Sequence, residues 1–579
     1  MITNIYNKVS EARKQIFHFS LFAFTLILQV PCLVSCSDFL DILPMNDVVL
    51  ENYWTERADV SSVLNSCYES LESSDALMRM GIWGELRSDN LVKGANVPND
   101  INEILKENIV STNPYCNWSK FYECINRCNT ICHYAPQVQA IDPNYSEEEM
   151  KANVAEAATL RAISYFYLIR TFRDVPYSTR PSIDDTQSFI LPATKFDDVL
   201  DSLINDLERV KDDAVRRYMV DRVDGSRYTF PAENSSRITR QAVWAVLADL
   251  YLWKGDWDNA VKYCDLVIEA KTKQYEELVE RVGDIKEIDL VDSIPMILES
   301  PVGGGGITCG SSYNNIFGSG NSFESIFELY FLNEENKPQN TWVKNYYGNS
   351  RNSRGYLSAN ELMLGEVIKN SNTLFKRTDG RFWESCDYSD FAIRKYVRRS
   401  VSYTTKNVTT ENGLQLSESL RPEARFNAPW ILYRLSDVLL IKAEALIERG
   451  NGDDFEQAFK LINIVNKRAN NLTETLKKAD YVITKLQMEN LVMEERQREF
   501  MFEGKRWFDL VRRSRRDGNT VYLVSAVQNK FEQNGNAIRI KLSDMNIIFM
   551  PYSKNELKVN PQLSQNPAYN NGEDSEFSR

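Results

Sequence analysis

The sequence is nearly without histidine and carries no excess of positive charge. His18 and His133 are the two histidines among its 579 residues. This scarcity excludes a zinc site built from several histidines. A catalytic triad that uses histidine would have one candidate, His133, because His18 lies in the N-terminal apolar stretch. Lysine and arginine total 68 against 81 acidic residues, a net charge of −13. Nucleic-acid phosphates are bound by basic surfaces, so we do not expect a general nucleic-acid binder.

A phosphate-binding loop is also missing. The run of glycines at 303–306 is not followed by the Gly-Lys-Ser/Thr of a P-loop, and no strand–turn–helix pattern surrounds it. We expect a flexible loop there, and we expect no nucleotide, metal or other cofactor. The remaining composition, 43% hydrophobic and 26% charged residues, is typical of a folded soluble protein.

The N-terminus has the pattern of a lipoprotein signal peptide. Basic residues (Lys8, Arg13 and Lys14) precede an apolar stretch over 16–34, and Leu-Val-Ser then leads into Cys36. A charged start, an apolar middle and small residues at the cleavage site mark a secretory signal. The alternative is a plain membrane anchor helix. We expect residues 1–35 to be removed and Cys36 to carry lipid, which would hold the mature chain on a membrane surface.

Four cysteines lie close together, at Cys116, Cys124, Cys128 and Cys132. The last three recur every four residues, so on a helix they share one face. Their spacing differs from the C-x2-4-C pairs of zinc sites. We therefore expect small buried core residues rather than metal ligands. A disulfide from Cys116 to one of the other three stays open, because such bonds form outside the cytosol.

Helical periodicity dominates the chain and includes a tetratricopeptide-like repeat. The segment RQAVWAVLADLYLWKGDWDNAVKYCDLVIEA carries that repeat's spacing at Trp244, Leu247, Ala248, Tyr251, Ala260 and Cys264. Looser copies are LLIKAEALIERGNGDDFEQAFKLI and AATLRAISYFYLIR. The pattern predicts a mainly α fold, a helical superhelix over about 36–272 and 427–515. The stretch at about 275–425, rich in glycine, asparagine and aromatic residues at 297–350, predicts a loop-rich irregular lobe.

Dense charge near the C-terminus has two interpretations. The segment EERQREFMFEGKRWFDLVRR begins at Glu494, and its carboxylates could suggest acid–base catalysis. Opposite charges three or four residues apart favour ion pairs instead, such as Glu495–Arg498 and Arg506–Asp509. The last segment, about 516–579, ends in a stretch rich in proline and asparagine, for which we predict ordered coil wrapped over the fold.

These segments together resemble the SusD/RagB family of outer-membrane nutrient-binding lipoproteins of Bacteroidetes. The resemblance extends over nearly the whole chain. It is carried by the lipobox at Cys36 with DFLDILP, YWTERADVSSVLNSCYESL, WGELRSDN, AEAATLRAISYFYLIRTFRDVPY, the Trp244 repeat, RLSDVLLIKAEAL, ERQREFMFEGKRWFDLVR and NPQLSQNPAY. One departure is Ala568, where the family commonly has glycine, and it puts only a local turn in doubt.

The resemblance implies a single domain over 36–579 with about four tetratricopeptide-like helix pairs. It implies a surface-exposed outer-membrane lipoprotein that forms a lid on a SusC-like TonB-dependent transporter. It also implies binding without catalysis, of an oligosaccharide or, in the RagB-like branch, of a peptide. A glycosidase on a helical scaffold is a third hypothesis, because such enzymes need only two suitably placed carboxylates.

Candidate ligand-binding residues come from two segments that combine aromatic and polar side chains on predicted loops. Sugars offer apolar ring faces and hydroxyl edges, which call for this combination. The candidates are Trp83, Arg87, Asp89 and Asn90 in the first segment and Tyr313, Asn314, Asn315, Trp342, Tyr346 and Tyr347 in the second. Trp83 could equally be a core residue, and Arg87 and Asp89 could belong to the framework.

Overall fold

A computed structural model gives the fold of the chain. The structure describes residues 53–183, 190–218, 222–224, 227–229, 232–283, 285, 287–299, 307–334, 337–348, 355–361, 374–376, 378–387, 389–405, 415–470, 476–481, 483–531 and 534–570. The predicted signal peptide, Cys36 and the glycine run at 303–306 lie outside these residues. The chain divides into two units, Met1–Thr55 and Glu56–Arg579, and the second unit contains the features described below.

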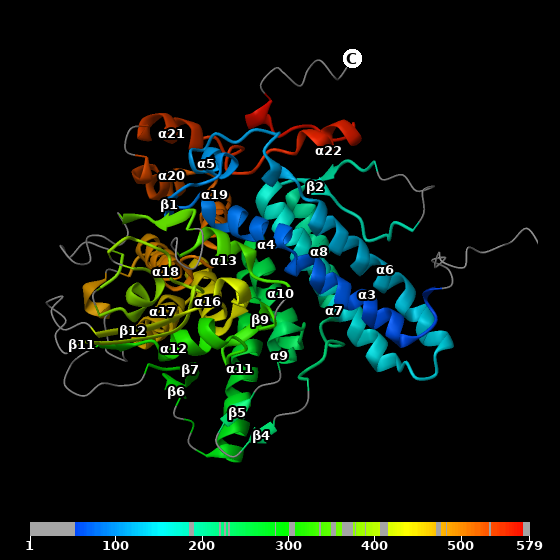
Figure 1. Ribbon diagram of the computed structural model, residues 1–579, viewed down its shortest axis with the longest axis horizontal. Helices are drawn as coiled ribbons and strands as arrows, with labels where there is room; N and C mark the ends of the chain where they lie inside the picture. The colour runs from blue at the N-terminus through cyan, green and yellow to red at the C-terminus, as the bar shows by residue number, and fades with distance from the viewer. Residues whose placement is uncertain are drawn as a thin grey trace, which may run out of the picture. The chain divides into compact units, whose positions relative to one another are not determined.

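Eight helices packed in succession form the framework of this unit (Figure 1). They make four pairs, and the second helix of each pair contacts the first helix of the next. The pairs are α3 (Arg57–Glu72) with α6 (Ser119–Ile141), α7 (Glu147–Phe172) with α8 (Phe196–Val210), α10 (Arg240–Lys254) with α11 (Trp257–Val282), and α16 (Leu435–Arg449) with α17 (Asp454–Ala469). The predicted mainly α, tetratricopeptide-like architecture is confirmed.

Local sequence explains where the best repeat, α10–α11, turns. Gly255 adopts a left-handed conformation (φ 82°) at the end of α10, which a residue without Cβ does at no steric cost. The Asp256 side chain then accepts a hydrogen bond from the Asn259 N–H and begins α11. Ala248, in the middle of α10, is completely buried. Helix α16 also ends at a left-handed glycine, Gly450 (φ 62°), but the Asp453 side chain at the start of α17 makes no corresponding hydrogen bond.

Two further helices close the framework at its C-terminal end. Helix α18 (Lys485–Phe500) packs against α16 and α17, and α19 (Arg506–Asp517) packs against the early π-helical turn η3 (Ile82–Leu86). Figure 1 shows the orange α19–α21 beside the blue α4 and α5. The early helices are α4 (Ser74–Gly81) and α5 (Asn99–Leu105). The tertiary fold therefore brings the two ends of the second unit together.

The predicted irregular lobe contains short strands and one-turn helices rather than loops alone. Helix α11 continues to Val282, beyond the predicted boundary of the framework. The lobe then contains β6 (Ile288–Val291), β7 (Ile294–Ile297), β8 (Ile307–Cys309), α12 (Ser311–Tyr313), η5 (Asn314–Ser319), β9 (Ser325–Leu329), α13 (Thr341–Tyr346), β10 (Leu357–Ala359), α15 (Gly380–Ser385), β11 (Arg398–Thr405) and β12 (Gln415–Leu420). These elements are too short to show as clear periodicity.

Two antiparallel strand pairs join the lobe to the framework. Strand β9 pairs with β13 (Trp430–Arg434), which leads directly into α16. Strand β10 pairs with β1 (Leu91–Lys93), with Leu91 opposite Ala359. Within the lobe, β6 pairs with β7, and β11 lies between β12 and β8. Small elements elsewhere are β2 (Val175–Pro176) with β3 (Ala193–Thr194), β4 (Arg222–Asp224) with β5 (Arg227–Thr229), and α9 (Glu233–Ser236).

The C-terminal segment wraps over the fold but is not coil throughout. It contains α20 (Val521–Val527), α21 (Gly535–Leu542) and α22 (Lys554–Val559). The prediction of coil for its proline- and asparagine-rich end is wrong at α22, because Pro551 and Pro561 flank this helix rather than interrupt it. The Met550 N–H donates to the Thr171 carbonyl, and the Lys554 N–H donates to the Ser111 carbonyl.

The cysteines of the described residues are all free thiols. Cys116, Cys124 and Cys128 are completely buried, which confirms their prediction as core residues, and Cys132 is half-buried. The Cys124 and Cys128 sulfurs lie 4.0 Å apart on α6. The described part of the chain contains no disulfide from Cys116 to its neighbours.

The packing of α10 gives a test of the repeat. Ala248→Leu places extra volume where the side chain is fully buried, and overpacking typically costs about 1–3 kcal/mol. We expect a lower midpoint in thermal unfolding followed by circular dichroism. Ala270→Leu makes the same change at a half-buried position of α11 and should have a smaller effect. Equal midpoints for the two variants would contradict close packing at Ala248.

Candidate functional site

The structure buries all eight side chains that the sequence nominated as principal ligand contacts. Their exposed fractions are 2% for Trp83, 1% for Arg87, 2% for Asp89, 0% for Asn90, 1% for Tyr313, 0% for Trp342, 2% for Tyr346 and 0% for Tyr347. A buried ring cannot offer its face to a sugar. The expectation that these residues lie on exposed loops is therefore wrong, and their contacts show what they do instead.

Trp83 is a core residue of η3. Its indole N–H donates to the Tyr115 carbonyl at 2.9 Å, which satisfies the polar end of a buried ring. Its ring packs against Phe121 and Phe172, with centroids 5.0 and 5.2 Å away. Trp83 thus joins the early segment to helices α6 and α7.

Arg87 holds the C-terminal segment against the early one. Its guanidinium pairs with buried Glu107, with Nη2 and Oε2 2.6 Å apart. It also donates to the carbonyls of Ile547 and Ile548, both at 2.9 Å, and lies over the Trp507 ring at 4.2 Å. Its burial between the early and C-terminal segments is that of a framework residue.

Asp89 and Asn90 belong to a buried junction with α18 and α19, which we call the Asp89–Arg506 junction. Arg506 donates from Nε and Nη2 to the two Asp89 oxygens, both at 2.9 Å. Gln497 donates to Asp89 and to Asn90, also at 2.9 Å. Burial alone would raise the pKa of Asp89, but the Arg506 guanidinium outweighs it and holds that pKa below its usual range.

Glu85 completes this junction by binding the α18–α19 turn. Its carboxylate accepts hydrogen bonds from the N–H groups of Phe502, Gly504 and Lys505 at 3.0–3.3 Å. Burial raises the pKa of Glu85 to about 7. The backbones approach so closely that a Cβ on Gly84 would lie 1.8 Å from the Gly504 oxygen. The glycine of the early WGEL segment is therefore required by tertiary packing.

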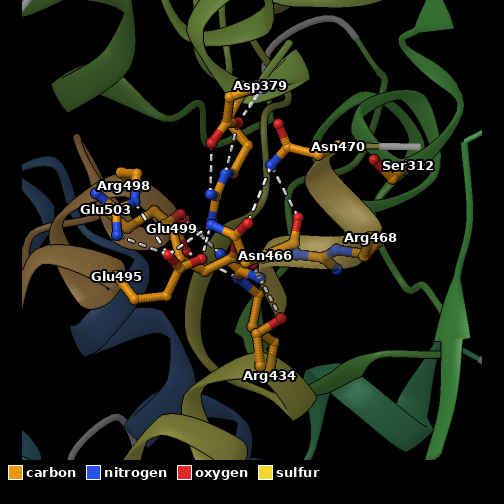
Figure 2. Close-up of polar contacts among 12 residues, drawn as sticks. Ser312, Asp379, Arg434, Asn466, Arg468, Asn470, Glu495, Arg498, Glu499 and Glu503 are labelled. Atoms are coloured by element: carbon orange, nitrogen blue, oxygen red, sulfur yellow. Dashed lines mark hydrogen bonds and ion pairs between the residues drawn. The ribbon is translucent and has the colours of Figure 1, made fainter. Parts of the chain in front are cut away.

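A second buried network occupies the interface of α16, α17, α18 and the lobe. Figure 2 shows Arg434 and Arg468 converging on Glu499. Arg381 donates to Glu495 and Glu499 at 2.8 and 2.9 Å, and Glu503 pairs with Arg434. The predicted pair Glu495–Arg498 is confirmed at 2.9 Å. The predicted pair Arg506–Asp509 is wrong: Arg506 binds Asp89, and Asp509 binds Arg496 and Arg512.

These ion pairs leave the carboxylates little scope for acid–base catalysis. Burial would raise the pKa of Glu499, but Arg468, Arg434 and Arg381 hold it well below its usual range. The cavity beside it has a volume of about 20 Å³, room for about one water molecule. It is too small for a sugar ring, so the network is structural.

The candidate ligand residues of the second segment lie in two separate parts of the structure. Tyr313 borders the cavity just described and donates to the Arg394 carbonyl at 3.1 Å. Trp342 stacks on Tyr346 with centroids 4.4 Å apart, and Tyr347 donates to the Phe502 carbonyl at 2.9 Å. The half-buried amides of Asn314 and Asn315 donate to the carbonyls of Val401 and Ser311. The Trp342 group meets the early segment through contacts of α13 with α4.

Two half-buried tyrosines at that meeting point were missed by the sequence analysis. The Tyr115 hydroxyl lies 3.2 Å from the Tyr346 hydroxyl, and the Tyr356 ring lies 5.6 Å from the Tyr346 ring. Half-buried Lys344 and Asn345 directly precede Tyr346 in the chain, and the Tyr356 N–H donates to the Asn345 carbonyl at 3.3 Å. We call this the Tyr115–Tyr356 surface. Partly exposed rings next to polar groups can stack on a sugar and bind its hydroxyls.

A sequence signal for these tyrosines existed, although it was weak. Tyr115 lies in an Asn-Pro-Tyr turn in which the Asn113 side chain accepts a hydrogen bond from the Tyr115 N–H at 3.0 Å. Tyr356 follows Gly355 and precedes β10. Turn residues with large rings are candidates for binding, but only the tertiary structure brings both of these tyrosines to Tyr346.

Comparisons with known proteins give consistent results. The model of the SusD family matches residues 319–569, and a model described as starch-binding associating with outer membrane matches residues 38–252. A SusD-like protein of Formosa agariphila is 24% identical over 569 residues, 94% of this chain and 98% of that protein. A SusD-like protein of Bacteroides ovatus is 25% identical over 39% of this chain and 38% of that protein.

Solved structures show the same fold. A SusD superfamily protein of Bacteroides thetaiotaomicron has a TM-score of 0.62 and 21% identity, covering 89% of this chain and 99% of that one. A putative sugar binding protein of Bacteroides vulgatus has a TM-score of 0.61 and 20% identity, covering 90% and 100%. Among the described residues, no helix is long and apolar enough to span a membrane, and no group of three metal-ligating side chains is present.

The Asp89–Arg506 junction predicts a stability effect. Asp89→Asn keeps the shape of the side chain but removes its charge, and breaking a buried ion pair typically costs about 3–5 kcal/mol. We expect a clear loss in the free energy of unfolding measured in urea. Asp258→Asn is the control, because the Asp258 side chain is 82% exposed in its pair with Arg449, and it should change little. Unchanged stability with lost ligand binding would restore Asp89 as a ligand residue.

Proposed function

The chain belongs to the SusD/RagB family, and on that premise we propose that it binds a glycan at the bacterial outer membrane without converting it. The observation that carries this proposal is the match of two SusD-type family models to successive parts of the chain, 38–252 and 319–569. The finer proposal is that the ligand is an oligosaccharide, passed on to a SusC-like TonB-dependent transporter.

The Tyr115–Tyr356 surface is our proposed contact for the oligosaccharide. It has two partly exposed rings, and half-buried Lys344 and Asn345 lie close to it in the chain, directly before Tyr346. Rings next to polar side chains are the combination that sugar rings require. The buried, stacked pair Trp342 and Tyr346 contacts these half-buried rings through Tyr346. A few ring contacts and hydrogen bonds would give micromolar to millimolar affinity, about −4 to −8 kcal/mol. Such affinity suits a protein that must release its cargo.

Binding without chemistry is supported by the pairing of the buried carboxylates. Glu495, Glu499 and Glu503 all bind cationic side chains, and a glycosidase needs two carboxyl groups that face the substrate. Product formation after long incubation with the bound oligosaccharide would contradict this part of the proposal.

Removing the two tyrosines should weaken binding and leave the fold intact. Aromatic contacts are worth about 0.5–1.5 kcal/mol each, so Tyr115→Ala with Tyr356→Ala should lower affinity roughly tenfold. Calorimetry with a fractionated pool of neutral oligosaccharides measures this. Tyr522→Ala, at a half-buried position on α20, is the control. Full affinity in the double variant would place the site elsewhere, and binding of a peptide pool but of no glycan would favour the peptide-binding alternative.

The sequence suggested Trp342 as a ligand contact, but the structure predicts that its removal affects stability. Because its ring is completely buried, Trp342→Ala should destabilise the protein by about 3–5 kcal/mol, rather than act on binding alone. It is therefore unsuitable as a binding-site variant.

Lipid attachment at Cys36 is the proposed link to the membrane. Cys36→Ala should abolish labelling with radioactive palmitate and leave the protein unprocessed or released from the membrane fraction. Ser37→Ala, at the neighbouring position, should label normally. Palmitate labelling of the Cys36→Ala variant would show that the anchor is a different residue.

A further inference from the structure

A polar pocket lies among α9, α10, α11 and the turn that leads into β9. Its lining includes Arg216, Arg217, Gln241, Lys271 and Gln274, together with Asn234, Ser235, Thr239, Asn321, Ser322, Phe323 and Ser325. We call it the Arg216–Lys271 pocket. Figure 1 shows α9, α10 and β9 close together. None of these elements contributes to the Tyr115–Tyr356 surface, so the pocket is a separate feature.

The pocket contains a buried ammonium group. Lys271 is only 4% exposed, and its Nζ donates to the carbonyls of Phe323 and Ser325 at 2.6 and 3.0 Å. An ammonium group has three protons, so one donor remains after these two bonds. Burial lowers the pKa of Lys271 to about 7, against the attraction of Glu324 and Glu328. A negative group in the pocket would favour the charged form.

A second cation lies at the exposed rim. The Arg216 guanidinium makes no ion pair or hydrogen bond with any residue in the described part of the chain. Arg217 is paired with Glu277, with Nη1 and Oε2 3.2 Å apart. An arginine without a partner keeps all five of its N–H donors for a ligand.

Negative charge is absent from the lining formed by described residues. Glu324 and Glu328, the two carboxylates that attract the Lys271 ammonium, also bind other groups. Glu328 accepts from the Asn321 N–H and the Ser325 hydroxyl at 2.6 and 2.8 Å, and Glu324 binds Arg468. The pocket therefore offers donors and positive charge in a chain whose net charge is −13, so nonspecific attraction of anions to the protein cannot explain binding there.

We propose that the Arg216–Lys271 pocket binds a single oxyanion, a carboxylate or a sulfate group. Its volume of about 20 Å³ corresponds to about one water molecule, so it admits one oxygen of such a group and excludes a sugar ring. An oxyanion group at the rim would accept from the Arg216 guanidinium while its inner oxygen accepts from the remaining Lys271 proton. Charge-assisted bonds of this kind are stronger than those of neutral partners.

The same chemistry could come from a free anion or from the acidic group of a glycan. The purified full chain should be titrated by calorimetry, in chloride buffer, with sodium sulfate, sodium glucuronate, glucose and a glucuronate-containing oligosaccharide. We expect sulfate or glucuronate to bind and glucose not to bind. Tighter binding of the acidic oligosaccharide than of glucuronate identifies a glycan group as the ligand, whereas equal binding identifies a free anion; both outcomes support the site.

Variants separate this site from a general charge effect. Arg216→Gln should weaken oxyanion binding at least about tenfold, and Arg216→Glu should abolish it. Arg216 is exposed, so both variants should fold. Arg180→Gln makes the same charge change at an exposed position outside the pocket and should bind normally. The variant lacking the Tyr115 and Tyr356 rings should also keep oxyanion binding, which keeps this test independent of the proposed glycan surface.

Two results would overturn the proposal. One is the absence of binding heat for sulfate, glucuronate and the acidic oligosaccharide at millimolar concentration. The other is equal affinity in the Arg216→Gln and Arg180→Gln variants, which would place any bound anion elsewhere.

Discussion

Buried charge is the constraint on which this structure depends. The Asp89–Arg506 pair joins residues 417 positions apart in the chain, and both side chains are almost completely buried. A buried charge without its partner costs several kcal/mol. The early segment, helix α18 and helix α19 must therefore be in place together. Glu85 adds to this by accepting hydrogen bonds from three backbone N–H groups in the α18–α19 turn, which would otherwise be buried without partners.

Helix α18 extends the pairing of buried charges into the lobe. Its charged residues are buried on more than one face, which is unusual for a helix with so many ionisable side chains. Glu495 and Glu499 bind Arg381 of the lobe, and Glu499 also binds Arg468 of α17. The lobe is thus held to the framework by ion pairs as well as by the strand pairs β9–β13 and β1–β10.

At the proposed glycan surface, the side chains that support the site differ from those that would contact the ligand. Trp342 and Tyr346 are shielded from solvent, while Tyr115 and Tyr356 reach the surface. A rigid base lets partly exposed rings bind without losing much conformational freedom. The Arg216–Lys271 pocket lies on other elements and carries the opposite chemistry, since it has donors and positive charge in place of aromatic rings.

The sequence by itself determined the mainly α class, the position of the best repeat and the buried thiols of α6. Periodicity, a turn glycine at 255 and small residues such as Ala248 are local signals, and local geometry follows from them. The resemblance to the family was visible in the same way. Ion pairing near Glu495 also followed from spacing along one helix, as the Glu495–Arg498 pair shows.

Only the tertiary structure decided which side chains face solvent. Asp89, which pairs with Arg506, and the Ile548 carbonyl, which Arg87 binds, each lie more than 400 residues from their partner. Spacing along a helix carries no information about such partners. The aromatic and polar residues of WGELRSDN have the composition of a sugar site, yet they pair with protein groups and are buried. Composition can name the side chains able to bind a ligand. Whether they remain accessible depends on contacts between distant segments, which form only when the chain has folded.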